Sequence, residues 1–98
     1  MAIEVRIPTI LRSYTGGEKA VEGKGETIND LFADLDGRHN GLRGRLVGDD
    51  GALNRFVNVY LNDEDVRFLG GIETPVSDGD VVTILPAVAG GGLDAAPV

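Results

Sequence analysis

The sequence predicts a two-layer α+β domain, in which one helix covers one face of a mixed sheet. Three observations support this class. Apolar and charged residues alternate from Ile3 to Ile7, as is typical of a strand with one buried face. Apolar residues follow Thr27 at helical spacing, and an apolar run from Val81 to Leu85 indicates a central strand. With 98 residues, the chain is long enough for one such domain.

The N-terminal segment predicts two strands joined by a turn. Pro8 ends the first strand or places it at a sheet edge, because proline has no N–H to donate to a neighbouring strand. A polar stretch containing Gly16 and Gly17 follows, and residues 19–22 are short enough to be the return strand of a hairpin.

The main helix is expected over residues 27–36. Thr27 and Asp30 form a variant of the capping box, and Gly37 is placed to end the helix in a left-handed conformation. The residues expected to face the sheet are Ile28, Leu31, Phe32 and Leu35.

The second half predicts three more strands. Residues 38–55 are expected to form a short helical turn and a loop, with Leu42, Leu46 and Leu53 as the buried side chains. Residues 56–61 are rich in β-branched and aromatic side chains, which indicates a strand. Residues 62–65 are expected to form the turn that follows it, and residues 66–68 a short partner strand. The apolar run from Val81 to Leu85 is the third strand. The order is therefore β-β-α-β-β-β.

Composition excludes several classes of function. The formal net charge of −7 and the pI near 4.4 disfavour nucleic acids and anionic membranes as partners, whereas a basic patch on another protein remains compatible. The chain has no cysteine, so it has no disulfide, no thiolate nucleophile and no Cys-ligated metal. The N-terminus lacks the apolar core of a signal peptide, which predicts a cytoplasmic protein.

Candidate catalytic and ligand-binding groups are few. His39 lies in a polar segment and is interpreted as a solvated loop residue rather than a catalytic base. The acidic residues of 62–65 lack the ligand spacing of a calcium loop, and the glycines near 16 and 25 lack the spacing of a phosphate loop. We therefore expect no catalytic residue, no metal site and no bound cofactor, so the chain is predicted not to be an enzyme.

The segment after Pro86 is the strongest candidate functional element. Val88, Ala89, Gly90 and Gly91 have little or no side chain, so this stretch can enter a narrow channel in a partner. At about 3.4 Å per residue, the stretch from Pro86 to Gly91 reaches about 17 Å. We expect residues 1–86 to form the domain and 87–98 a flexible tail.

Residues 84–91, preceded by Asp78, Gly79 and Asp80, resemble the C-terminal signature of the ubiquitin-like sulfur carriers of the ThiS and MoaD group. Within that group, residues 55–68 and 7–12 resemble the actinobacterial carriers of cysteine biosynthesis. The resemblance extends from Ile3 to Gly91 and implies a β-grasp fold.

The resemblance also implies a chemistry and a set of partners. An E1-like adenylating enzyme would activate the carboxylate of the terminal glycine, Gly91, and a sulfur donor would convert it to a thiocarboxylate. A PLP-dependent cysteine synthase would then accept the sulfur, and a JAMM-type metalloprotease would release the cysteine. Gly90, Ala89 and Val88 would support the reactive terminus.

The sequence departs from the family pattern after Gly91, because Gly92 and residues 93–98 follow it. A peptide amide cannot be adenylated, so the resemblance predicts a precursor that is cut after Gly91 or after Gly92. Two alternatives remain open. One is a MoaD- or ThiS-type carrier for molybdopterin or thiazole synthesis, and the other is a ubiquitin-like adaptor or modifier without sulfur chemistry.

Overall fold

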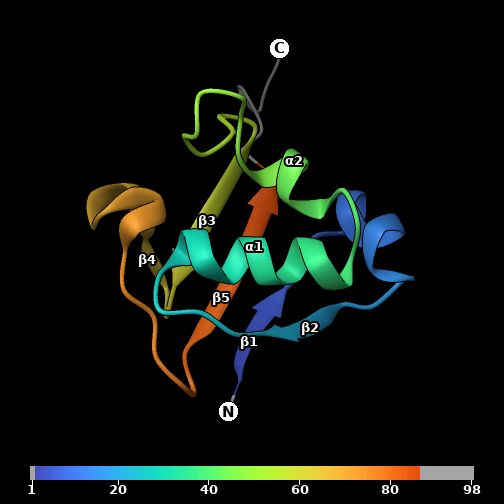
Figure 1. Cartoon of the computed structure of the whole chain (residues 1–98), viewed down its shortest axis with the longest axis horizontal. Coiled ribbons are helices and arrows are strands. Elements are labelled where there is room, and N and C mark those ends of the chain that lie inside the picture. Colours follow the sequence, from blue (N-terminus) through green and yellow to red (C-terminus); the bar gives the residue numbers. More distant parts are fainter. Residues whose placement is uncertain (1, 87–98) are drawn as a thin grey trace.

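The fold is a mixed five-stranded sheet with its main helix, α1, packed across one face (Figure 1). The structure, a computed structural model, describes residues 2–86. The strands are β1 (Ile3–Arg6), β2 (Ala20–Gly23), β3 (Val57–Leu61), β4 (Glu64–Asp65) and β5 (Val81–Pro86). The helices are α1 (Ile28–Arg38) and α2 (Leu42–Leu46), with the 3₁₀ helices η1 (Thr9–Thr15), η2 (Val66–Phe68) and η3 (Gly71–Glu73). The predicted α+β class is confirmed.

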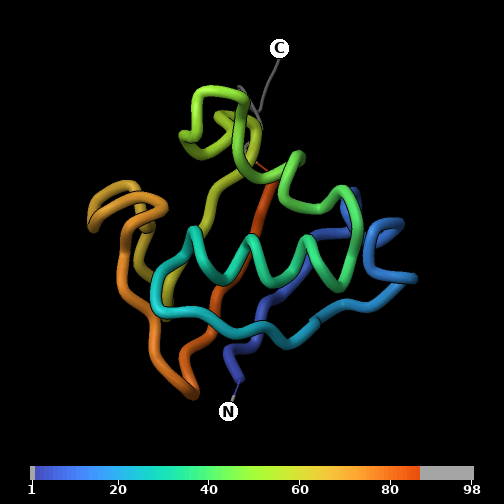
Figure 2. The backbone as a smooth tube through the Cα atoms, in the orientation of Figure 1, coloured from blue at the N-terminus to red at the C-terminus, as the bar shows by residue number. Residues whose placement is uncertain are grey.

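The strand order is β2-β1-β5-β3-β4, which places β5 at the centre as predicted. β5 is parallel to β1 and antiparallel to β3, and the other neighbouring strands are antiparallel. Because β1 and β5 run in the same direction, their C-terminal ends lie at the same end of the sheet (Figure 2).

The core lies between the sheet and α1. The four predicted helix residues are all fully buried, and the inward residues of β1, β3 and β5 face them. At the helix N-terminus, the Thr27 hydroxyl accepts a hydrogen bond from the Asp30 N–H at 3.2 Å, as the capping pattern predicted. The core consists of Ile3, Val5, Ile7, Leu11, Ile28, Leu31, Phe32, Leu35, Leu42, Leu46, Val47, Val57, Val59, Val66, Val76, Val82 and Ile84.

The predicted left-handed cap at Gly37 is wrong, because α1 continues through Gly37 to Arg38. Arg38 forms an ion pair with Asp34 at 3.0 Å, one turn earlier, and the His39 N–H donates to the Leu35 carbonyl at 2.7 Å. The left-handed residue is instead Gly41, with φ 92°, immediately before α2.

The predicted partner strand over 66–68 is also wrong. Asn62 and Asp63 both have positive φ, so they form a tight turn and pairing with β3 begins at Glu64. The Asp65 carboxylate then accepts the Arg67 N–H at 2.9 Å, which starts the 3₁₀ helix η2 and turns the chain away from the sheet.

Two glycines, one beside the first turns of α1 and one near its C-terminal end, give opposite stability predictions. We expect Gly37→Ala to raise the free energy of unfolding by about 0.5–1 kcal/mol, because the helix position has open space around an added Cβ. At Gly25 an added Cβ would lie 2.6 Å from the Leu31 nitrogen and 2.9 Å from the Asp30 carbonyl carbon. Gly25→Ala should therefore destabilise the protein by about 1–3 kcal/mol. Urea unfolding of both variants tests this, and a shift of the same sign in both would contradict it.

Candidate functional site

The predicted site residues Gly91, Gly90, Ala89, Val88 and Gly92 lie outside the described residues. The structure does describe the strand from which they continue. The candidate site is therefore the C-terminal end of β5 together with the surface around Pro86.

β5 is anchored along its length before it reaches that end. Val82 and Ile84 are buried under α1, while Leu85 points away from the core with 44% of its surface exposed. On one side β5 pairs with β3 as far as Pro86, opposite Val57. On the other side the register with β1 stops at Thr83, because the chain leaves β1 at Pro8 and enters η1.

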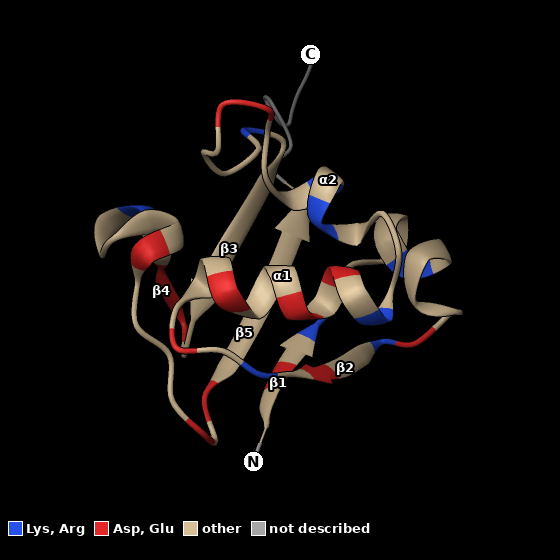
Figure 3. Cartoon of the chain, viewed as in Figure 1, with Lys and Arg blue, Asp and Glu red and all other residues tan. Residues whose placement is uncertain are grey.

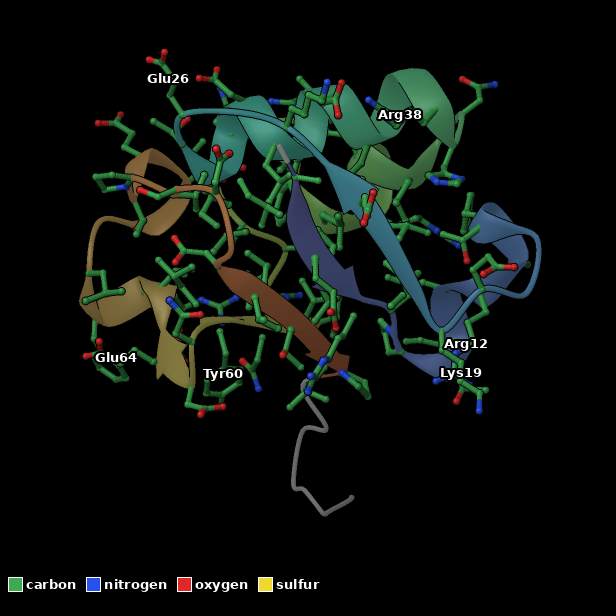
Figure 4. The ribbon with its side chains drawn as sticks, turned by 90° about the horizontal axis from the view of Figure 1, so that it is seen from below. Arg12, Lys19, Glu26, Arg38, Tyr60 and Glu64 are labelled. Carbon is green, nitrogen blue, oxygen red and sulfur yellow. The ribbon has the colours of Figure 1, made fainter. Side chains whose placement is uncertain are left out.

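The early end of β1 leaves a groove of about 520 Å³ between the last residues of β5 and η1, which we call the tail-root groove. Its lining comes from β1, the β1–η1 junction, η1, β2 and β5: Glu4, Arg6, Ile7, Pro8, Thr9, Ile10, Arg12, Lys19, Ala20, Thr83, Ile84, Leu85 and Pro86. Arg12 and Lys19 lie on the side of the sheet away from α1 (Figure 4).

The tail-root groove combines cations with exposed apolar side chains. Arg6 is paired with Glu4 at 2.9 Å, and the Arg12 Nε donates to the Ile7 carbonyl at 3.2 Å. Among residues 2–86, neither Arg12 nor Lys19 has an ion-pair partner. Ile10 is 64% exposed at the groove wall, and the exposed Leu85 also lines the groove. The site can therefore bind an apolar surface that carries negative charge.

A smaller groove of about 260 Å³ lies on the other side of Ile10 and is lined in addition by Leu11, Arg45, Asn54, Phe56 and Val57. Arg45 lies over the Tyr14 ring at 5.8 Å from its centroid. Figure 3 shows cations on η1, α2 and the end of β1, whereas acidic residues dominate α1, β2, β4 and the loop after α2.

The other sequence candidates play structural roles. His39 is half-buried and closes α1 through its backbone N–H. In the turn after β3, the Asn62 side chain accepts the Val81 N–H at 2.9 Å and donates to Asp80 at 3.0 Å, which ties the turn to β5. The turn predicted over 62–65 is therefore confirmed for Asn62 and Asp63 and is wrong for Glu64 and Asp65, which form β4. In the part of the chain that the structure covers, no cluster of His, Cys, Asp and Glu residues is arranged to hold a metal ion.

A second exposed apolar site was not recognised from the sequence. Phe68 of η2 is 86% exposed, and a groove of about 440 Å³ lies near it, between the loop at Asp50 and η3. We predicted a strand at 66–68, and one face of such a strand would be buried. The sequence therefore gave no reason to expect an exposed apolar site at Phe68. Its lining includes no residue of β5 or η1.

A sequence model of the ThiS family matches residues 5–91, which is most of the chain. The chain belongs to the ThiS family. This confirms the family resemblance and, together with the solved structures below, the β-grasp fold. The family match includes the diglycine and extends to the residue that the sequence analysis identified as reactive.

Relatives of this ThiS-family chain include the sulfur carrier protein CysO of Mycobacterium tuberculosis H37Rv, 54% identical over 93% of this chain and all of the relative. Small archaeal modifier protein 3 of Haloferax volcanii is 35% identical, with the same coverage. Among solved structures, the BexX/CysO complex of Amycolatopsis orientalis contains a chain with a TM-score of 0.86 and 60% identity, matching 92% of this chain and all of that one. No helix within the described residues is long and apolar enough to cross a membrane.

Proposed function

We propose that this chain is a sulfur carrier that holds sulfur as a thiocarboxylate on Gly91 and delivers it for cysteine synthesis. The main support is the family match through residue 91, in a chain 54% identical to CysO. The position of β5 adds a physical argument. A central strand, held by two neighbours and by α1, provides a rigid support for the segment that follows it.

The chemistry needs a free carboxylate at Gly91. A carboxylate is a poor electrophile, so the adenylating enzyme joins it to AMP from ATP and releases pyrophosphate. A sulfur donor then attacks the carbonyl carbon and displaces AMP, which leaves the thiocarboxylate. This group supplies a nucleophilic sulfur in a chain that has no cysteine. The carrier itself contributes presentation, and the enzymes contribute catalysis.

The division of labour follows from the two parts of the chain. Residues 1–86 form the β-grasp domain that partners recognise, and 87–98 form the tail. Val88, Ala89 and Gly90 add little bulk, so they bring Gly91 into a buried active site up to about 17 Å from Pro86. The partners are an E1-like adenylating enzyme, a PLP-dependent cysteine synthase and a JAMM-type metalloprotease.

Maturation is part of this proposal. Gly92 and residues 93–98 block the reactive carboxylate as a peptide bond, so a protease must cut after Gly91, or after Gly92 if the additional glycine shifts the register. The cut changes the net charge little, since it removes one acidic residue, Asp94. Exposure of the carboxylate is its chemical consequence.

A second candidate function is that of a ubiquitin-like modifier, and the similarity to small archaeal modifier protein 3 favours it. A modifier forms an amide with a lysine of its target instead of carrying sulfur. A carrier for molybdopterin or thiazole synthesis would share the thiocarboxylate and differ in its acceptor.

Mass spectrometry of the protein purified from its native host tests the proposal. We expect a C-terminus at Gly91 or Gly92 and a fraction of molecules in which one oxygen is replaced by sulfur. A matured terminus found solely in amide linkage to other proteins would support the modifier function instead. An uncut chain in cells that are making cysteine would contradict both the processing and the carrier role.

A further inference from the structure

We propose that Lys19 is an internal acceptor for Gly91. Once the terminal carboxylate has been activated, the amine of Lys19 in the same chain attacks it and closes the tail into a loop through an isopeptide bond. This inference rests on the proposed function and adds a self-modification site to it. The reaction competes with sulfur transfer, so it is expected when the sulfur donor is scarce. The closed chain has no free carboxylate and therefore no longer carries sulfur.

The first argument is that lysine is rare in this chain. Among its nine basic residues, Lys19 and Lys24 are the two lysines, and the others are arginines. An arginine guanidinium stays protonated, whereas a lysine amine that has lost its proton attacks activated acyl groups. Both lysines are exposed, and neither has an ion-pair partner among residues 2–86. The two side chains are therefore chemically matched, and position decides between them.

The second argument is that the sheet places Lys19 at the same end as the root of the tail. The Lys19 carbonyl accepts the Ile7 N–H at 2.8 Å, one residue beyond the point where Arg6 is level with Thr83 of β5. Neighbouring strands lie about 4.8 Å apart and each residue adds about 3.3 Å, so the backbones of Lys19 and Pro86 are separated by about 12 Å. Both residues also line the tail-root groove.

The number of residues between Pro86 and Gly91 fits this separation. An unstructured chain of five residues has a root-mean-square span of about 12 Å and reaches about 17 Å when it is extended. A linker gives its highest effective concentration, in the millimolar range, when its average span matches the distance to be bridged. Gly91 therefore meets Lys19 of its own chain far more often than it meets an amine on a second chain at micromolar concentration.

Lys24 lies at the opposite end of β2. Gly23, the residue before it, pairs with Ile3 at the start of β1, whereas Pro86 ends the parallel strand β5. The same strand spacing places Lys24 about 25 Å from Pro86. This is well beyond the extended reach of about 17 Å to Gly91. The geometry therefore selects Lys19 and makes Lys24 a matched control.

The bond changes are those of an acyl transfer. The nitrogen of the deprotonated Lys19 amine attacks the carbonyl carbon of the Gly91 acyl adenylate and forms a C–N bond. The C–O bond to AMP breaks, AMP leaves with the electron pair, and the nitrogen releases a proton to solvent. Arg12, which also lines the groove, attracts the negatively charged phosphate of the adenylate toward this site.

The experiment incubates the chain that ends at Gly91 with the adenylating enzyme of the same host and ATP, with and without sulfide. Without sulfide, we expect a monomeric product that is lighter than the starting chain by one water. A digest should contain Gly91 joined to the side chain of Lys19. The yield of this product per AMP formed should not change on dilution, because the reaction is intramolecular. With sulfide, the thiocarboxylate should replace most of it, since sulfide attacks the same carbonyl carbon.

Lys19→Arg keeps the charge and removes the nucleophile, so it should lower the yield of closed chain per AMP formed at least about tenfold. Lys24→Arg should leave that yield within about twofold of the parent. Division by the AMP formed separates a loss of attack from a loss of activation, and thermal unfolding identifies variants that have lost structure.

Four results would overturn the proposed closure: a closed chain that persists in Lys19→Arg, a bond to Lys24, a product of two joined chains, or no lighter product from a chain that forms thiocarboxylate normally with sulfide. Failure of the unsubstituted chain to form a thiocarboxylate with sulfide would instead overturn the proposed function.

Discussion

A chain that ends at Gly91 is expected to be converted to a thiocarboxylate by the adenylating enzyme, ATP and sulfide, whereas the chain that extends to Val98 is not. The difference is one of chemistry rather than binding, because both forms carry the same tail-root groove. A peptide bond after Gly91 leaves no carboxylate to attack ATP. Intact mass measured over time under protease-free conditions gives the result directly. Equal conversion of the two forms would mean that the reactive group lies elsewhere.

The same assay tests how closely the enzyme fits the tail. Gly91→Ala places a methyl group beside the reacting carbon, and a displacement of about 1 Å at a reacting centre can cost about 100-fold in rate. We therefore expect the Ala-ending variant to be converted about 100-fold more slowly than the Gly-ending one. His39→Ala is the control, since His39 closes α1 and has no role in the proposed chemistry. A large loss in His39→Ala would contradict the assignment of the reaction to the tail.

Phe32→Ala is expected to produce the largest loss of stability in the domain. Phe32 is fully buried between α1 and the sheet and is the largest of the fully buried side chains. Its truncation removes about 3–5 kcal/mol, from lost apolar burial and from the cavity that remains. A small domain has only about 5–15 kcal/mol in total, so a substantial fraction of molecules should unfold at moderate temperature.

Denaturant unfolding measures this loss, and Phe68→Ala serves as the control. Phe68 is the same residue type but 86% exposed, so its truncation should change the unfolding free energy by no more than about 0.5 kcal/mol. Similar losses in the two variants would mean that the packing of α1 does not dominate stability. Conversion per folded molecule should stay unchanged in Phe32→Ala, because the reactive tail and the groove lie outside the core.

Local patterns along the chain were enough to predict most of the architecture. The burial pattern of β1, α1 and β5 is visible in the sequence of each element taken alone. The spacing of apolar residues was therefore enough to predict these three elements. The capping role of Thr27 was equally local, since donor and acceptor lie three residues apart. The candidate tail was identified by composition and by the family resemblance, both of which can be read without coordinates.

The wrong predictions concern the end of α1 and residues 66–68. At both places the local sequence favours one structure, and hydrogen bonds to other parts of the chain stabilise a different one. At Gly37 the glycine favours an ending, but the Asp36 carboxylate accepts the N–H groups of Gly41 and Arg43 at 3.1 and 3.2 Å, which moves the turn beyond α1. At 66–68 the β-propensity of Val66 and Phe68 favours a strand, but Arg67 donates to the Asn58 side chain and the Val57 carbonyl and holds η2 against β3.

The tail-root groove could not be predicted for a related reason. Its walls come from segments separated by more than seventy residues in the chain, and they meet because β5 pairs in parallel with β1 and extends beyond it. No periodicity in Arg12, Lys19 or Leu85 signals that meeting, because it depends on strand order and on where each strand stops. The sequence thus determines which segment can react, and the packing of distant strands determines the surface that surrounds it.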